Sequence, residues 1–382
     1  MILGIDASNL RAGGGVTHLN ELLYVAKPKE YGFDQVIVWG SKSTLDIIKD
    51  RSWLIKVHEP MLDQALPMRL YWHKFIFDRS ARSAGCTILF VPGGSFRGAF
   101  RPFVTMSRNM LPFEFSEARR FGISWPRFRY DLLHRLQSKT FSRAQGVIFL
   151  SDYARSIVKR EVNGQITKET VIPHGVDSRF SCQPREQKDI SEYSLQNPFR
   201  ILYVSIVNLY KHQWNVAEAV SKLRRTGLPV QVDFVGPAYP PALRRLKTAM
   251  TTFDPEGEYL HYIGPVPFNQ LHTMYHQADA FVFASSCENM PNILLEAMAA
   301  GLPIACSNKG PMPEILGDAG VYFDPENLNE IADSLHELIA DSGLRVKLAH
   351  GAHSRATNYS WSRCANETFS FLAQVAKEKD RV

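Results

Sequence analysis

The 382-residue chain has few cysteines and no long apolar run, and both shortages exclude classes of protein. Its five cysteines are odd in number, widely spread and free of any Cys-x-x-Cys pair, which argues against a disulfide framework and a zinc site. No window approaches the roughly 18 to 20 uncharged apolar residues that a membrane-spanning helix needs. The N-terminal stretch MILGIDASNL has no basic leader, so it predicts a first buried strand and not a secretory signal. We therefore expect a cytoplasmic protein.

The composition and length indicate a globular protein of two domains. Hydrophobic residues make up 45% of the chain and charged residues 21%. At 382 residues the chain is too long for one ordinary core and suits two domains of roughly 150 to 200 residues each. A two-domain chain is expected to have a cleft.

Predicted strands and helices alternate in both halves of the sequence. The segment 181–199 is polar, contains proline and has no apolar period, so it is predicted to be the inter-domain linker. This order predicts an α/β protein with two Rossmann-like domains in tandem and a binding crevice at the carboxyl ends of their strands. Strands are expected at 2–6, 34–40, 87–94, 102–107 and 145–151, and then at 200–207, 230–236, 259–264, 278–285, 302–307 and 320–324.

Two glutamates, Glu288 and Glu296, flank a predicted helix start. Pro291 suits the first helical residue, Asn289 or Met290 the cap, and the helix is expected over about 292–300. Free backbone N–H groups at this start would cradle a phosphate, and the two carboxylates would accept hydrogen bonds from ribose and sugar hydroxyls. The alternative is that the acids only complement the helix dipole while small residues pack the helix onto a sheet.

These glutamates, with seven residues between them, and the following LLEAMAAGLPIACSNKGPMPEIL resemble the Glu-x7-Glu region of the retaining GT-B glycosyltransferases of family GT4. The similarity continues through 317–335, 171–177 and 359–372. It implies a GT-B fold, in which two Rossmann-like domains face each other across a cleft. The implied parts are an acceptor-binding domain at 1–180, the linker at 181–199, a nucleotide-sugar-binding domain at 200–358 and a C-terminal helix at 359–382 that packs back toward the first domain.

The resemblance also implies roles for individual residues. Glu296 matches the position that contacts the donor ribose, and Lys211 matches a lysine that binds the diphosphate. Ile206 stands where many relatives have an arginine, so His212 or a residue of the other domain is expected to help Lys211. We predict Glu288 and Lys211 as catalytic residues. The predicted donor-binding residues are Gly14, Gly15, Lys211, His212, Asn289, Met290, Pro291, Asn292 and Glu296.

In the first domain, Gly14 and Gly15 belong to a glycine-rich loop that the resemblance places beside the donor phosphates. Arg108, followed by Asn109, occupies a place where relatives often carry a histidine, and both are acceptor-side candidates. A simple cap for the following helix is the alternative for Arg108. His174 is expected to be a residue of the domain junction and not a catalyst.

The donor is expected to be a nucleotide-diphosphate sugar, with GDP-mannose as a first guess. No Asp-x-Asp occurs in the chain, so the paired carboxylates that would hold a divalent metal on such a donor are missing. We therefore expect no metal cofactor. Two other functions stay open: sugar-nucleotide epimerisation on the same fold, and non-catalytic binding of a nucleotide sugar.

The segment 117–146 is rich in basic and aromatic residues. Seven arginines and lysines stand against Glu117 and Asp131, and a second such stretch covers 68–82. This combination suits an anionic lipid surface, although a solvated helix face is the alternative. We expect peripheral association with the inner face of the cytoplasmic membrane, a lipid-linked glycan acceptor, and a role in a cell-surface polysaccharide such as O-antigen, lipopolysaccharide, capsule or exopolysaccharide. No nucleic acid partner is expected. The interleaved aromatic residues are Phe121, Trp125, Phe128 and Tyr130.

Overall fold

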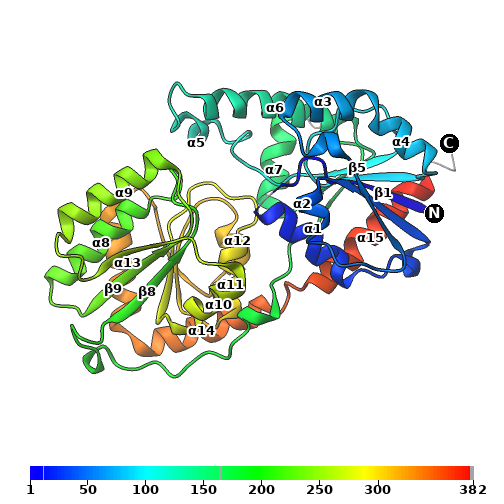
Figure 1. Cartoon of the computed structure of the whole chain (residues 1–382). Helices are drawn as coiled ribbons and strands as arrows, with labels where there is room; N and C mark the ends of the chain where they lie inside the picture. The colour runs from blue at the N-terminus through cyan, green and yellow to red at the C-terminus, as the bar shows by residue number, and fades with distance from the viewer. Residues whose placement is uncertain (12, 163–165, 379–382) are drawn as a thin grey trace. The chain divides into compact units, whose positions relative to one another are not determined.

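The computed structural model describes residues 1–11, 13–162 and 166–378, and the chain divides into two compact units. Unit 1 comprises Met1–Ala118, Gly122–Gly175 and the chain from Ser360 onward. Unit 2 comprises Val176–Tyr359 together with the short segment Arg119–Phe121. In Figure 1 the red C-terminal helix lies among the blue elements of unit 1, so the end of the chain belongs to the same unit as its beginning.

Unit 1 is built on a seven-stranded parallel sheet with the order β3-β2-β1-β4-β5-β6-β7. Its strands are β1 (Ile2–Asp6), β2 (Gln35–Gly40), β3 (Leu54–His58), β4 (Ile88–Val91), β5 (Phe103–Met106), β6 (Gly146–Phe149) and β7 (Glu169–Val171). Its helices are α1 (Gly14–Val25), α2 (Lys42–Leu45), α3 (Leu66–Phe75), α4 (Phe77–Ser83), α6 (Trp125–Arg143), α7 (Asp152–Glu161) and α15 (Trp361–Glu378), while α5 (Phe115–Arg119) ends at the first residue assigned to unit 2. Two 3-10 turns, η1 (Pro28–Tyr31) and η2 (Pro60–Leu62), complete the unit as described.

Unit 2 repeats the plan with a six-stranded parallel sheet of order β10-β9-β8-β11-β12-β13. The strands are β8 (Phe199–Val204), β9 (Val230–Val235), β10 (Leu260–Gly264), β11 (Ala280–Phe283), β12 (Ile304–Ser307) and β13 (Val321–Phe323). The helices are α8 (Gln213–Arg225), α9 (Pro240–Phe253), α10 (Phe268–Gln277), α11 (Asn292–Ala299), α12 (Met312–Leu316), α13 (Leu328–Ala340) and α14 (Ser342–Ala356), with 3-10 turns η3 (Ser178–Phe180) and η4 (Ile190–Glu192).

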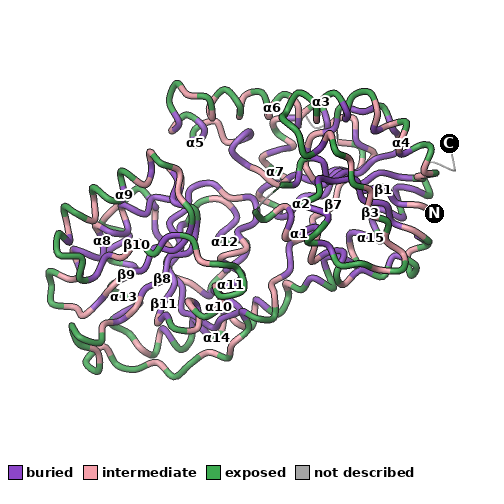
Figure 2. Tube along the Cα trace, viewed as in Figure 1, coloured by how far each residue is buried: buried purple, intermediate pink, exposed green. Residues whose placement is uncertain are grey.

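The central strands are apolar along their whole length because helices cover both faces of each sheet. Every residue of β4, β5, β6, β11 and β12 is buried, and Figure 2 shows the strands in purple inside outer helices that carry most of the green, exposed chain. The predicted α/β class and the eleven predicted strands are confirmed. The prediction missed β3 and β7, which are edge strands with no fully buried residue and therefore no apolar run.

The C-terminal helix α15 packs on α1 and closes one face of the unit 1 sheet. The Phe369 ring lies 6.1 Å from that of Phe33, and Phe371 and Val375 lie directly over β6 at Gly146. A Cβ atom placed on Gly146 would be 2.8 Å from the Phe371 ring and 3.1 Å from Val375. Gly146 is therefore the residue that allows α15 to approach the sheet this closely.

The polar segment 181–199 is fastened to unit 2 by a buried arginine of α14. Arg345 is fully buried and donates hydrogen bonds to the carbonyl oxygens of Leu338, Ile339 and Lys188 and to the side chain of Gln187. A guanidinium offers five N–H donors, which suits the capture of several carbonyls at once. The segment is therefore tied to the rest of unit 2 although it has almost no regular structure.

The aromatic residues of 117–146 do not all reach the surface. Trp125 and Phe128 of α6 are exposed, but Phe121 is buried, and its ring lies 5.8 Å from that of Tyr239 within unit 2. The neighbouring Arg120 forms an ion pair with Glu326 at 2.6 Å. The expectation that Phe121 belongs to an exposed aromatic surface is wrong, because its ring packs on α9's N-cap residue instead.

We predict that Gly146→Ala destabilises the protein by about 1 to 3 kcal/mol, because the added methyl group forces Phe371 and Val375 away from the sheet. Chemical denaturation followed by circular dichroism measures the change. Gly343→Ala, at an exposed position of α14, is the control and should stay within about 0.5 kcal/mol of the wild type. Equal stabilities of the two variants would contradict this account of α15 docking.

Candidate active site

The strand order of unit 2 brings the loops after β8 and β11 to the same edge of the sheet. The first strand of the unit, β8, pairs with both β9 and β11, so the chain leaves β8 and β11 in opposite directions around the sheet. In open α/β sheets, ligands bind outside the carboxyl ends of the strands at this switch in direction. The two loops that follow these strands, 205–212 and 284–291, carry most of the predicted donor-binding residues.

The buried hydroxyl of Tyr203 joins the two loops. It donates a hydrogen bond to the carbonyl oxygen of Lys211 at 2.5 Å and accepts one from the backbone N–H of Ala284 at 3.2 Å. Burial holds the pKa of Tyr203 well above its usual value, so the hydroxyl stays a donor at all working pH values. A further bond runs from the N–H of Ser286 to the carbonyl of Tyr210 at 2.8 Å. The loops are thus fixed to each other before any ligand binds.

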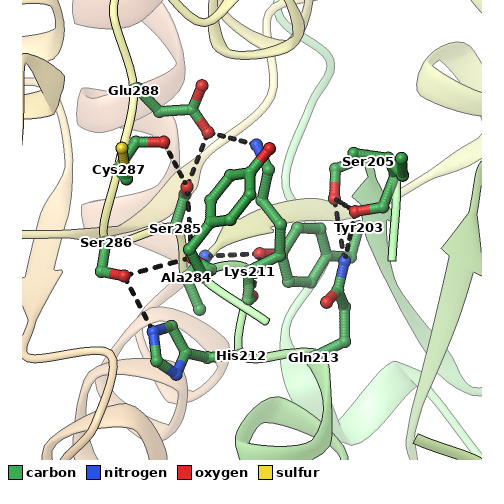
Figure 3. A network of polar contacts seen from close by, with 12 residues as sticks. Tyr203, Ser205, Lys211, His212, Gln213, Ala284, Ser285, Ser286, Cys287 and Glu288 are labelled. Atoms are coloured by element: carbon green, nitrogen blue, oxygen red, sulfur yellow. Dashed lines mark hydrogen bonds and ion pairs between the residues drawn. The ribbon is translucent and has the colours of Figure 1, made fainter. Parts of the chain in front are cut away.

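Lys211 and Glu288 form an ion pair across these loops, as Figure 3 shows. The same oxygen of Glu288 accepts a hydrogen bond of 2.6 Å from the hydroxyl of Ser285. Lys211 is only 4% exposed, and its ammonium group lies 4.9 Å from the centre of the Phe283 ring. The structure therefore brings together the two residues predicted as catalytic, a cation and a carboxylate in a poorly solvated place.

His212 holds a backbone conformation that is rare for its residue type. Its φ of 50° is left-handed, and it is the single non-glycine residue with positive φ in the described part of the chain. The residue caps α8, and its Nε2 atom lies 3.0 Å from the hydroxyl of Ser286. Backbone strain of this kind concentrates at functional sites, because the surroundings must enforce it. The strain directs the His212 ring toward the loop that carries Glu288.

Helix α11 covers Asn292–Ala299, which confirms the expected helix over about 292–300. Pro291 is its N-cap and not its first helical residue, so neither Asn289 nor Met290 is the cap. No side chain caps this end, and the buried Oδ1 atom of Asn292 has no hydrogen-bond partner. The open helix start keeps its N–H groups available for an anion, as expected from the sequence.

Glu296 occupies a different environment from Glu288. It is buried on α11 and accepts a hydrogen bond of 2.9 Å from the hydroxyl of Tyr275. Burial raises the pKa of Glu296 to about 7, although the Tyr275 hydrogen bond acts in the opposite direction. The charged neighbours that act on it are Asp177 and Arg179, at the turn η3.

Ile206 supplies no charge to the site. Its side chain is exposed, and its carbonyl oxygen accepts hydrogen bonds from Gln213 at 3.1 Å and Ser205 at 2.9 Å.

Three residues of the site were not predicted from the sequence: Tyr203, Ser285 and Tyr275. In the sequence, Tyr203 and Tyr275 look like ordinary core aromatic residues. Ser285 could have been found from its position directly after a buried strand.

In unit 1, the structure brings Arg108 to the glycine-rich loop. The Nη1 atom of Arg108 lies 2.8 Å from the point where a Cβ atom on Gly15 would be, and Gly14 is close by. Asn109 instead accepts a hydrogen bond from the N–H of Leu111 and shapes the local turn. His174 is buried with its ring 5.7 Å from that of Trp361.

The described residues contain no group of three or more His, Cys, Asp or Glu side chains placed to hold a metal ion. None of the helices in that part of the chain combines the length and apolar character needed to cross a bilayer.

A family model described as glycosyl transferases group 1 matches residues 184–355. The matched region lies within unit 2 and covers less than half of the chain. The O-antigen chain mannosyltransferase B of Escherichia coli is 36% identical over 113 residues, which are 29% of this chain and 29% of the relative. A GDP-mannose-dependent alpha-(1-6)-phosphatidylinositol monomannoside mannosyltransferase of Mycobacterium tuberculosis is 27% identical over 242 residues, 59% of this chain and 61% of that protein. Each match spans less than two thirds of the relative's own length.

The chain also resembles a solved structure along almost its whole length. The sucrose-phosphate synthase of Thermosynechococcus elongatus superposes with a TM-score of 0.77 at 16% identity, covering 98% of this chain and 99% of that one. At this identity the likeness shows the fold alone. It confirms the predicted GT-B class of two Rossmann-like domains.

We predict that binding of a nucleotide-sugar donor depends on pH through Glu296. Hydrogen bonds from ribose hydroxyls to an ionised carboxylate are stronger than those to the neutral acid, so donor affinity should rise as pH increases from 6 to 8, and Glu296→Gln should remove that rise. Glu296→Ala should weaken donor binding by about 1.5 to 3 kcal/mol without unfolding the protein. Isothermal titration calorimetry at several pH values measures both effects.

The raised pKa of Glu296 also makes the stability of the fold depend on pH, but in the opposite direction: stability falls as pH rises. Because the folded value lies above the ordinary 4.5, Glu296 favours folding below that pH, and its contribution is lost as pH rises through about 7. As pH increases from 5 to 8, the Glu296→Gln variant should therefore become more stable relative to the wild type. A donor affinity that is independent of pH in the wild type, or unchanged in the folded Ala variant, would overturn the assignment of Glu296 to the ribose.

Proposed function

We propose that the chain is a glycosyltransferase that transfers a sugar from a nucleotide-diphosphate sugar to a glycan acceptor with retention of anomeric configuration. The observation that carries this proposal is the cluster of Lys211, Glu288 and His212 beside the open start of α11, at the switch point of the unit 2 sheet. The cluster offers a cation and backbone N–H groups to a diphosphate and a carboxylate to sugar hydroxyls.

In the proposed mechanism, unit 2 stabilises the departing diphosphate. Negative charge on that group grows as the glycosidic bond breaks, and Lys211 with the N–H groups of α11 compensates it in a site of low polarity. The acceptor hydroxyl attacks from the face that the diphosphate leaves, so retention needs no covalent intermediate with the protein. Glu288 positions the sugar through its hydroxyls. We propose that this chemistry proceeds without a bound metal ion.

Several observations support a mannosyl donor and a membrane-linked acceptor. Both named relatives are mannosyltransferases, and the M. tuberculosis protein is described as GDP-mannose-dependent, so GDP-mannose is the proposed donor. The E. coli relative carries O-antigen in its name, which favours a cell-surface polysaccharide as the product. In unit 1, α6 exposes Trp125 and Phe128, and α3 exposes Tyr71 and Phe75. Because basic residues alternate with these rings, we propose that the protein binds an anionic membrane peripherally at its cytoplasmic face and takes a lipid-linked acceptor.

The direct test is turnover of a panel of GDP- and UDP-sugars, followed by NMR with and without a lipid-linked glycan extract. Acceptor-dependent release of nucleoside diphosphate, with an unchanged anomeric configuration in the product, supports the proposal. Conversion of the donor sugar without acceptor would indicate an epimerase. Absence of turnover with every donor would indicate a binding protein.

We predict that Lys211→Ala lowers kcat more than it weakens donor binding, because the charge it compensates is larger in the transition state than in the bound donor. Steady-state kinetics and calorimetry with the same donor separate the two effects. Lys347→Ala, at an exposed position of α14, is the matched control and should leave both unchanged. Equal losses in kcat and in donor affinity would make Lys211 a binding residue only.

Membrane association is tested by co-sedimentation with liposomes. We predict binding to vesicles with anionic lipid, a steep decrease between 0.1 M and 1 M salt as the screening length falls from about 10 Å to about 3 Å, and loss of binding in a Trp125→Ser, Phe128→Ser, Arg129→Ser variant. Val346→Ser, which removes an exposed apolar side chain of unit 2, is the control. Protein that stays in the supernatant with anionic vesicles at low salt would favour a soluble acceptor.

A further inference from the structure

Two aromatic rings lie beside the ammonium group of Lys211. Its Nζ atom is over the face of the Tyr210 ring, 5.2 Å from the ring centre, and over that of Phe283, 4.9 Å from the centre. An ammonium group within about 6 Å of a ring centre is attracted by the negative face of the ring. Lys211 therefore has two aromatic contacts in addition to its ion pair with Glu288.

The two rings differ in what else they do in the fold. Phe283 is the last residue of β11 and is fully buried, and its ring lies 6.2 Å from that of Phe281, so it belongs to the core around the sheet. Tyr210 is a loop residue and is only half-buried. Its place over Lys211 is therefore not explained by core packing.

The backbone of Tyr210 is fixed to the loop that carries Glu288. Its carbonyl oxygen accepts hydrogen bonds from the N–H of Ser286 at 2.8 Å and from the hydroxyls of Ser286 at 3.3 Å and Ser285 at 3.4 Å. None of these three bonds involves the Tyr210 side chain. The ring can therefore be changed by mutation without removing this connection between the loops.

Lys211 has to act without a second cation from its own loops. It is the only lysine or arginine in the segments 205–212 and 284–291. Glu288 pairs with the ammonium group, but its negative charge also opposes the entry of a diphosphate. An aromatic ring attracts the ammonium group through its quadrupole and carries no net charge, so it does not repel that anion.

We propose that Tyr210 is a positioning residue, whose ring holds the Lys211 ammonium group in place for the donor diphosphate. This inference rests on the proposed function. A diphosphate that binds at Lys211 displaces water from the half-exposed ring, and the attraction between ring and ammonium group strengthens as water leaves. Glu288 then turns to the sugar hydroxyls while Lys211 stays in place. In this role Tyr210 acts through Lys211 and not on the reacting atoms.

The role is tested first by changing the side chain of Tyr210. Tyr210→Leu keeps an apolar side chain but removes the ring, and it should lower kcat about five- to tenfold, a loss between those of an exposed and a fully desolvated cation–π contact. Tyr210→Phe keeps the ring face and should stay within about twofold of the wild type. Steady-state kinetics measures both. Wild-type activity of the Leu variant, or an equal loss in the Phe and Leu variants, would overturn the proposal.

Tyr24→Leu is the matched control. The exposed Tyr24 ring of α1 in unit 1 also contacts two cations, with Lys49 at 4.5 Å and Arg51 at 5.1 Å from its centre. The variant removes the same kind of contact and should leave kcat unchanged. An equal fall in kcat in both Leu variants would show that the effect is not specific to Tyr210.

Fluorinated rings at position 210 separate electrostatic attraction from packing. Each fluorine atom withdraws charge from the ring face and weakens its hold on a cation, while the shape of the ring changes little. With phenylalanine that carries none, one, two or three fluorine atoms in place of Tyr210, kcat should fall steadily along the series. The same series in place of Tyr24 should be flat. A flat series at position 210, in variants that circular dichroism shows to be folded, would mean that Tyr210 only packs and would overturn the proposal.

The affinity for GDP or UDP keeps this test separate from the proposed transfer reaction, because calorimetry needs no turnover. The affinity should fall about threefold between the unfluorinated and the trifluorinated ring at position 210. If the wild type binds a nucleotide with this dependence but turns over no donor, the transfer reaction fails and the contact between Tyr210 and Lys211 stands. If the wild type turns over a donor and neither kcat nor affinity responds to the ring, the transfer reaction stands and the role of Tyr210 is refuted.

Discussion

The candidate active site depends on one hydroxyl group, that of Tyr203. Its hydrogen bonds to Lys211 and Ala284 connect the loops after β8 and β11, which the strand order places side by side but does not itself join. This connection sets the positions from which Lys211, His212 and Glu288 act. Because the hydroxyl is buried and stays protonated, the arrangement is independent of pH in the working range. The geometry is therefore formed before the ligand arrives, as electrostatic catalysis requires.

The buried ion pair between Lys211 and Glu288 connects this geometry to function. A buried ion pair stabilises a fold only weakly, since both charged groups lose their hydration. The pair does hold the Lys211 side chain in place in the absence of ligand. A bound diphosphate offers the ammonium group a second anion, which releases part of the Glu288 carboxylate for sugar hydroxyls.

Sequence alone predicted the parallel sheets and the placement of Glu288 and Glu296, because apolar strands and a helix start leave clear local patterns. It did not predict contacts between distant segments. Arg108 and Gly15 lie far apart in the sequence, and only the β1-β4-β5 order brings them together. Tyr203 looks like any core aromatic of a strand, and the left-handed conformation of His212 has no sequence signal. Phe121 was misplaced because a ring beside arginines suits a surface as well as a packing contact.

The most direct test of the account is a double-mutant cycle on Lys211 and Glu288, with calorimetry of nucleoside diphosphate binding. Lys211→Gln should weaken binding strongly, whereas Glu288→Gln should leave it equal or tighter, because a competing carboxylate is lost while the lysine remains. The double variant should bind like Lys211→Gln alone. If both single variants bind the nucleotide as the wild type does, the cluster at the β8 and β11 loops is not the diphosphate site.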